Sequence, residues 1–104
     1  MLQLRPNCEW CDADLPPQAP NAMICSYECT YCATCVRDVL HDVCPTCGGG
    51  FAPRPVRPAR AHRAGLSLGL AHHPASATRT HSRWTAAEVA ELAALLRDTP
   101  PSDR

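Results

Sequence analysis

Eight cysteines are the residues of this 104-residue chain whose type and spacing could do chemistry. All of them lie within one short window, in the order Cys8-x2-Cys11-x13-Cys25-x3-Cys29-x2-Cys32-x2-Cys35-x8-Cys44-x2-Cys47. Thiolates suit the borderline-soft zinc ion, which takes four tetrahedral ligands in structural sites. The spacing therefore predicts two structural Zn²⁺ ions, each closed by four thiolates.

The cysteines can be divided between the two ions in two ways. The interleaved arrangement, which we favour, makes site 1 from Cys8, Cys11, Cys32 and Cys35, and site 2 from Cys25, Cys29, Cys44 and Cys47. The sequential alternative groups the first four and the last four cysteines. Interleaving places Cys32 and Cys35 at the positive N-terminal end of an expected helix. It also closes longer loops, which constrains the unfolded chain more.

The last cysteine pair has the residues of a metal knuckle, a tight C-x2-C turn whose backbone N–H groups point at the sulfurs. In Cys44-Pro45-Thr46-Cys47-Gly48, Pro45 fixes one φ angle. Gly48 can take the positive φ that the chain needs directly after such a turn.

Metal coordination is expected to shape this half of the chain, because it has few large apolar side chains and such short modules usually need metals or disulfides. Trp10, Tyr27 and Tyr31 are predicted to form a small core around the metals. No apolar run resembles a signal peptide or a membrane span. We therefore expect a cytoplasmic protein, in which thiols stay reduced and bind metal.

Charge divides the chain into three zones although its formal net charge is zero. Residues 1–50 carry −4, residues 51–84 carry six arginines and no acid, and residues 85–104 carry −2. The expected organisation is a cysteine-rich zinc-binding module (1–50), a disordered Pro/Arg-rich linker (51–81), an amphipathic helix (82–98) and a tail (99–104).

The helix prediction rests on its first turn. Thr85 and Glu88 form a capping box, and an apolar stripe follows. A helix this short is marginal alone in water. We therefore expect it to dock on a protein partner through Trp84, Val89, Leu92 and Leu96.

Arg54, Arg57, Arg60 and Arg63 recur every three residues among prolines, and would line one edge of a polyproline II helix. Three interpretations are open: a strip that binds nucleic-acid phosphates, a strip that folds back on the acidic module, and a solvated linker of biased composition. The last is favoured.

The ligand order and gaps resemble a RING-type cross-brace domain, with Cys29 where histidine is often found. More narrowly, residues 1–58 resemble a bacterial family, domain of unknown function 1272. The stretches that carry this resemblance are Leu2-Gln3-Leu4-Arg5-Pro6-Asn7-Cys8-Glu9, Asp14-Leu15-Pro16-Pro17, Ile24-Cys25-Ser26-Tyr27-Glu28-Cys29-Thr30-Tyr31-Cys32, Cys44-Pro45-Thr46-Cys47-Gly48-Gly49 and Arg54-Pro55-Val56-Arg57-Pro58.

The resemblance implies a small metal-stabilised α+β fold, RING- or treble-clef-like, and no established activity. RING-type ubiquitin transfer is disfavoured, because Glu9 and Gly48 stand near the places where such ligases have an apolar residue and a cation. The expected function is a non-catalytic zinc-binding interaction or regulatory module with a protein partner. Nucleic-acid binding through the arginines and electron transfer through iron are the alternatives.

Overall fold

The computed structural model describes residues 1–104, and its fold is organised around a small antiparallel sheet with strand order β2-β1-β3. The strands are β1 (Ala22–Ile24), β2 (Thr30–Cys32) and β3 (Ala52–Pro53). In the register of the first pair, Met23 lies opposite Tyr31. The turn between β1 and β2 carries Cys25 and Cys29 at its base, where the Cys25 N–H donates to the Cys29 carbonyl at 3.2 Å.

A short helical segment follows β2 directly, at the place where a helix beginning with Cys32 and Cys35 is expected. It consists of α1 (Ala33–Cys35) and a single π turn, η1 (Val36–Leu40). Cys32 is its N-cap, since its sulfur accepts from the Cys35 N–H. His41 ends the segment in the left-handed conformation, with φ 51°. Val36 and Leu40 are both buried, so the apolar side of this segment faces the interior.

Cysteine is the commonest residue in the interior of the cysteine module. Its central cluster contains 13 buried residues, and six of them are cysteines. Tyr31 is buried and its ring meets that of Phe51 edge-on, with centroids 5.6 Å apart, while Trp10 packs at the margin. Tyr27 does not join this core as predicted. It lies in the turn between β1 and β2, and 74% of it is exposed.

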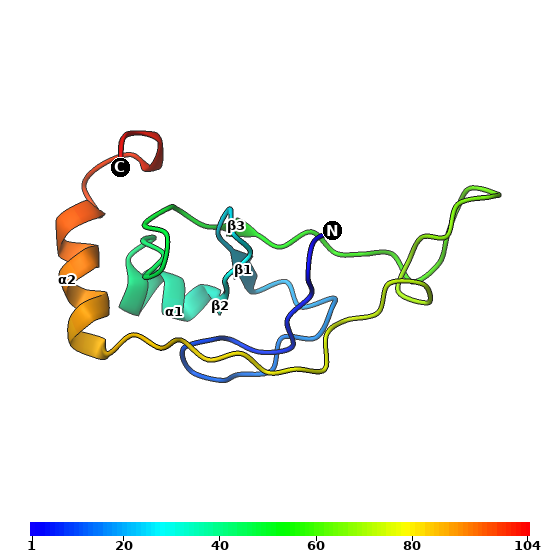
Figure 1. Cartoon of the computed structure of the whole chain (residues 1–104), viewed down its shortest axis with the longest axis horizontal. Coiled ribbons are helices and arrows are strands. Elements are labelled where there is room, and N and C mark those ends of the chain that lie inside the picture. The colour runs from blue at the N-terminus through cyan, green and yellow to red at the C-terminus, as the bar shows by residue number, and fades with distance from the viewer.

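The C-terminal helix α2 (Ala86–Leu96) begins at Thr85 with both hydrogen bonds of the predicted capping box. It is shorter than the predicted 82–98, and a 3₁₀ turn, η2 (Pro101–Asp103), follows. The helix packs against η1, and its buried Val89 belongs to the central cluster. The prediction that Val89 docks on a partner is therefore wrong: the surface that this helix needs is the protein's own cysteine module (Figure 1).

Residues 51–81 are not a detached, disordered linker, and this prediction is wrong at both ends of the segment. The first part forms β3, and the Arg54 N–H donates to the Ala22 carbonyl. The last part, residues 76–82, which we call the strap, runs along the N-terminal segment and pairs with the Leu4 and Glu9 carbonyls through Ser76 and Ser82. Backbone pairing of this kind leaves no periodic signal in the side chains.

Between these two ends, residues 58–72 reach away from the module at the end of the molecule opposite α2 (Figure 1). The whole molecule is elongated, measuring 49 × 27 × 19 Å. No helix in it has both the length and the apolar character needed to cross a membrane.

Candidate metal centres

The first cluster gathers Cys8, Cys11, Cys32 and Cys35, whose sulfur atoms all lie within 4.8 Å of one another. The Cys11 and Cys32 sulfurs are 3.8 Å apart. Zinc–sulfur bonds of about 2.3 Å set tetrahedrally around one ion require sulfurs about 3.8 Å apart. The donor set and its spacing therefore fit a tetrathiolate ion, and the cysteines that meet are those of the interleaved arrangement.

Two matching knuckles build this first cluster. The Cys11 N–H donates to the Cys8 sulfur, and the Cys35 N–H donates to the Cys32 sulfur, each at 3.5 Å. Such donors favour the thiolate form. Burial has the opposite effect and raises the pKa of Cys35 well above the ordinary range of a thiol. A cation between the sulfurs would offset this cost of burying thiolates.

The second cluster gathers three sulfurs, from Cys25, Cys44 and Cys47, within 4.8 Å of one another. Cys29 is buried beside them but outside this set. A hydrogen bond with Cys44 is the main cause that lowers the pKa of Cys29 to about 6, and a bond with Cys25 acts in the same direction. The predicted fourth ligand is thus held next to Cys25 by the turn between β1 and β2, in which the Cys25 N–H donates to the Cys29 carbonyl.

The knuckle at residues 44–47 has the local geometry that its sequence predicts. Gly48 takes a φ of 78°, and its N–H donates to the Cys44 carbonyl at 2.8 Å. The Gly49 N–H donates to the Cys47 sulfur at 3.4 Å. A Cβ on Gly48 would come within 3.1 Å of Leu96 on α2. Glycine thus provides both the turn and the room for the helix.

The four arginines of the predicted strip do not act as one surface. Arg54 is only 4% exposed, and its guanidinium donates to the carbonyls of Arg5, Leu15 and Pro16 at 2.8 to 3.2 Å. Arg57 donates to the carbonyls of Leu2 and His73.

Arg54 and Arg57 therefore bind backbone of their own chain, which contradicts a four-arginine phosphate strip. Only Arg60 and Arg63 of this set are exposed. The first two follow β3, where carbonyls of the N-terminal segment are within reach, and the last two lie on the segment that reaches away from the module (Figure 1).

The strap contributes a polar cluster that sequence reasoning missed. Arg79 donates to the carboxylates of Asp12 and Asp14 at 2.8 to 3.0 Å, and its guanidinium holds the pKa of Asp12 below its usual range. Asn7 and Thr80 exchange two hydrogen bonds. These partners are far apart in the sequence, and neither local pattern nor spacing links them.

The fold and its two thiol clusters define a small cysteine-rich α+β protein suited to hold two metal ions. Residues 1–57 match the family model described as protein of unknown function (DUF1272), and the chain belongs to this family. The match ends at Arg57, the second of the two arginines that bind the module.

The similarity to one relative extends beyond this family region. An uncharacterised protein of Rhizobium meliloti (strain 1021) is 52% identical over 79 residues, which are 76% of this chain and 84% of the relative. No solved structure matches the chain.

Proposed function

We propose that this protein is a non-catalytic zinc-binding module of the cytoplasm that presents an interaction surface to other macromolecules. The observation that carries the proposal is the interleaving of the two clusters. Cys8 and Cys11 meet Cys32 and Cys35 in one cluster. Cys25, which lies between these two pairs in the sequence, meets Cys44 and Cys47 in the other. Two ions so placed would cross-brace one short chain.

The metal would supply folding energy in this arrangement. The module has a small interior in which six of the 13 central residues are cysteines, so apolar burial contributes little. Structural zinc sites stabilise small domains directly, because the site is absent from the unfolded chain. Cys8, Cys11, Cys32 and Cys35 would hold the first ion, and Cys25, Cys44 and Cys47 the second, with Cys29 completing it.

A binding role is favoured over a catalytic one by the donor set. Four thiolates close a zinc site and leave no position for a substrate or a reactive water. The arginine arrangement does not favour nucleic acid, since Arg54 and Arg57 are bound to backbone carbonyls. The protein is thus best suited to present a rigid surface to a binding partner.

Metal analysis of the full-length chain, purified under reducing conditions, tests this proposal. We expect two zinc ions per chain, a colourless protein, and loss of dispersed NMR signals when a strong chelator removes the metal. Addition of zinc to the chelated sample should restore the spectrum, which serves as the control for irreversible damage.

Two results would contradict the proposal. A metal-free chain that keeps its dispersed spectrum would show that the clusters are not needed for folding. A coloured protein that contains iron would indicate an electron-transfer centre instead of structural zinc sites.

A further inference from the structure

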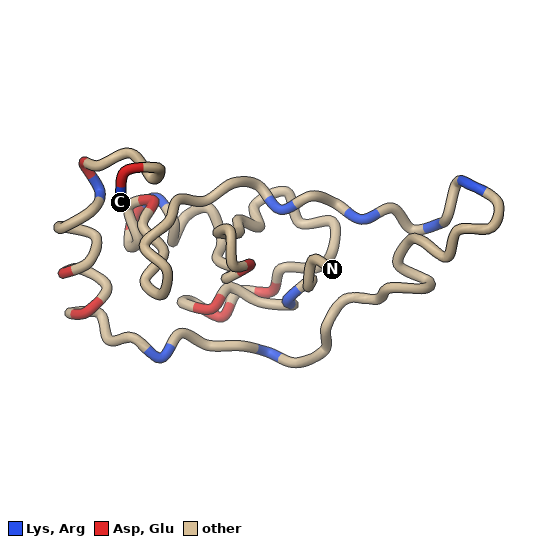
Figure 2. The backbone as a smooth tube through the Cα atoms, turned by 45° about the horizontal axis from the view of Figure 1, so that its top comes forward, with Lys and Arg blue, Asp and Glu red and all other residues tan.

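The two ends of this molecule have opposite charge, and both expose apolar side chains. Figure 2 shows arginines on the segment that reaches away at one end and acids on α2 at the other. Of the large apolar residues that are most exposed, Leu66 and Leu68 lie at the first end and Leu95 lies at the second. An exposed apolar patch that is rimmed by polar residues is typical of an interaction site.

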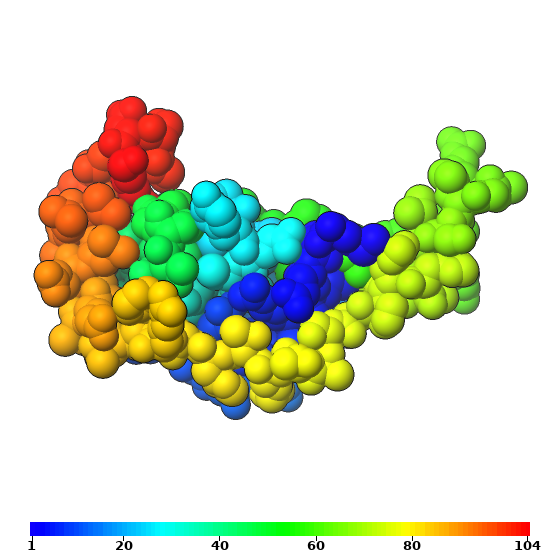
Figure 3. Space-filling model, viewed as in Figure 1, coloured from blue at the N-terminus to red at the C-terminus, as the bar shows by residue number.

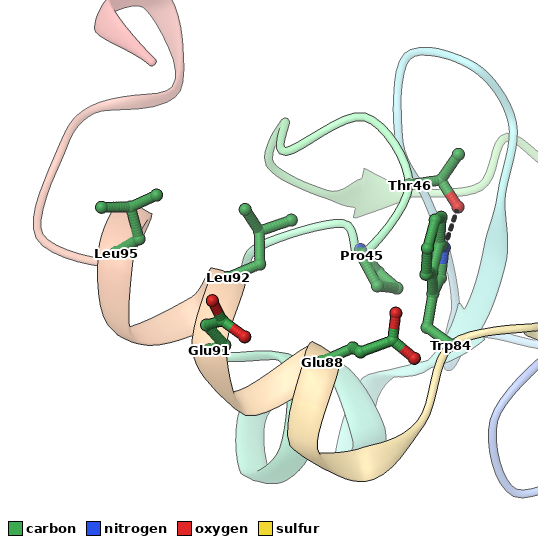
Figure 4. Close-up of a pocket in the computed structure, with 7 residues that line it drawn as sticks. All are labelled: Pro45, Thr46, Trp84, Glu88, Glu91, Leu92 and Leu95. Atoms are coloured by element: carbon green, nitrogen blue, oxygen red, sulfur yellow. Dashed lines mark hydrogen bonds between the residues drawn. The ribbon is translucent and has the colours of Figure 1, made fainter.

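At the α2 end, a groove of about 320 Å³ lies between one side of the helix and the knuckle at residues 44–47. Pro45 forms one wall, and Leu92 and Leu95 form the other. Trp84 closes one end, where its indole N–H donates to the Thr46 hydroxyl at 3.0 Å (Figure 4). The groove is apolar inside and open to solvent, and Leu95 is 72% exposed.

The groove also has an acidic rim. Glu88 and Glu91 both line it from α2. Glu88 uses one carboxylate oxygen to cap the helix, where it accepts from the Thr85 N–H, while Glu91 makes no ion pair. The rim therefore favours an occupant that is both apolar and positively charged.

At the opposite end, residues 58–70 form a closed loop, which we call the arm loop. Its ends meet where the Leu70 N–H donates to the Pro58 carbonyl at 2.9 Å. Gly69 has a φ of 90°, and a Cβ there would come within 2.8 Å of the Arg60 backbone, so the closure depends on glycine. Between these ends the loop exposes Arg60 and Arg63 together with Leu66 and Leu68.

We propose that the acidic groove of one chain binds the arm loop of a second copy. The loop offers the chemistry that the groove favours, two leucines and two unpaired arginines, and no other exposed segment of this chain combines them. The loop cannot fill its own groove, because the two lie at opposite ends of a molecule 49 Å long.

The contact joins two different surfaces, so it is heterologous and repeats head to tail. One small loop in one groove buries less surface than a permanent interface needs, so the association is weak and reversible. Its rim charges are exposed and screened by salt, which makes the association stronger at low ionic strength. This contact requires the folded module but not a particular metal.

Sedimentation velocity of the metal-loaded chain over a wide concentration range tests the proposal. We expect a weight-average mass that rises with concentration at low salt and falls back toward the monomer at high salt. A groove variant, Glu91→Gln with Leu95→Ser, and an arm variant, Arg60→Gln with Arg63→Gln, should each weaken self-association by about tenfold or more. All four positions are exposed, so the variants should fold.

The decisive measurement mixes the two variants. The arm variant keeps an intact groove and the groove variant keeps an intact arm, so the mixture should form a 1:1 complex that grows no further. Arg37→Gln, which removes an exposed arginine on η1, should associate like the wild type.

Three outcomes would overturn the proposal. They are a wild type that stays monomeric, a mixture that forms no complex, and association that survives both variants. Metal content measured on each sample separates these outcomes from a failure of metal binding.

Discussion

The two cysteine clusters have similar knuckles but differ in how the rest of the chain covers them. The first knuckle, residues 8–11, lies under the strap, which binds it by polar contacts: Ser82 N–H to the Glu9 carbonyl at 2.7 Å, and Arg79 to Asp12. The second knuckle, residues 44–47, lies under α2, which packs on it through apolar side chains such as Leu96.

One continuous segment, residues 76–104, makes both covers. Figure 3 shows the strap lying against the N-terminal segment and α2 following it along the module. The end of this segment returns to the second knuckle, where the Arg104 guanidinium donates to the Gly48 carbonyl at 2.9 Å. Residues 76–104, which lie outside the cysteine window, are therefore part of the fold. We expect the strap to respond to loss of polar contacts and α2 to loss of apolar contacts.

The largest expected effect is a difference between the two clusters in how strongly each depends on a single cysteine. Cys8→Ser should cost one metal ion and unfold the module, because Cys8 is fully buried among four gathered sulfurs and structural zinc contributes about 10–16 kcal/mol of apparent binding energy. Cys29→Ser should keep the second ion at lower affinity, since Cys29 lies outside the three gathered sulfurs. Native mass spectrometry reports the metal count and NMR reports the fold.

Cobalt provides the control for this pair of variants. Cobalt loaded into the wild type should give the absorption of two thiolate sites, and in Cys29→Ser the thiolate absorption of one site should weaken without being lost. If Cys29→Ser unfolds the module as fully as Cys8→Ser, Cys29 is as necessary for its cluster as Cys8 is for the other.

A smaller effect is expected at Arg54, which binds carbonyls on both sides of the first knuckle. Arg54→Met should lower the free energy of unfolding by about 2–4 kcal/mol, because it leaves the Arg5 and Leu15 carbonyls without their donor, while the Pro16 carbonyl keeps the Ala19 N–H. Arg60→Met is the matched control, since Arg60 is exposed on the arm loop, and should change stability little. Denaturant unfolding of the metal-loaded chains measures both. Equal losses would mean that the Arg54 contacts contribute nothing.

The turn of the knuckle at residues 44–47 and the start of α2 could be predicted because their determinants are local. A C-x2-C knuckle needs only a turn of four residues with suitable types, and Pro45 and Gly48 supply them. The capping box likewise involves residues three apart, Thr85 and Glu88. In both cases the interacting residues lie within one turn of the chain, so the local sequence is sufficient to predict the structure.

The role of the arginines and the path of the strap could not be predicted in this way. Arg54 and Arg60 belong to the same three-residue arginine repeat, and only contacts with distant parts of the chain bury one and leave the other exposed. The strap pairs through backbone groups and one long-range arginine, Arg79, which leave no periodicity. Tyr27 and Tyr31 likewise differ only in that one lies in a turn and the other in β2.

The smallest expected effect distinguishes the two covers, and hydrogen exchange is sensitive enough to detect it. Arg79→Gln removes the ion pairs with Asp12 and Asp14, so the strap should open more often and the Ser76 and Ser82 amides should exchange faster. Added salt should act on the wild type in the same direction, because these carboxylates are exposed and screened.

The amide of Arg97, which caps α2 by donating to the Ala93 carbonyl, should keep its protection under both changes, since apolar packing is not weakened by salt. Val89→Ala is the reciprocal variant: it should speed exchange in α2 and leave the strap unchanged, because Val89 packs on the module while the strap binds by polar contacts. If either variant speeds exchange equally in both parts, residues 76–104 open as one unit and the two covers are not independent.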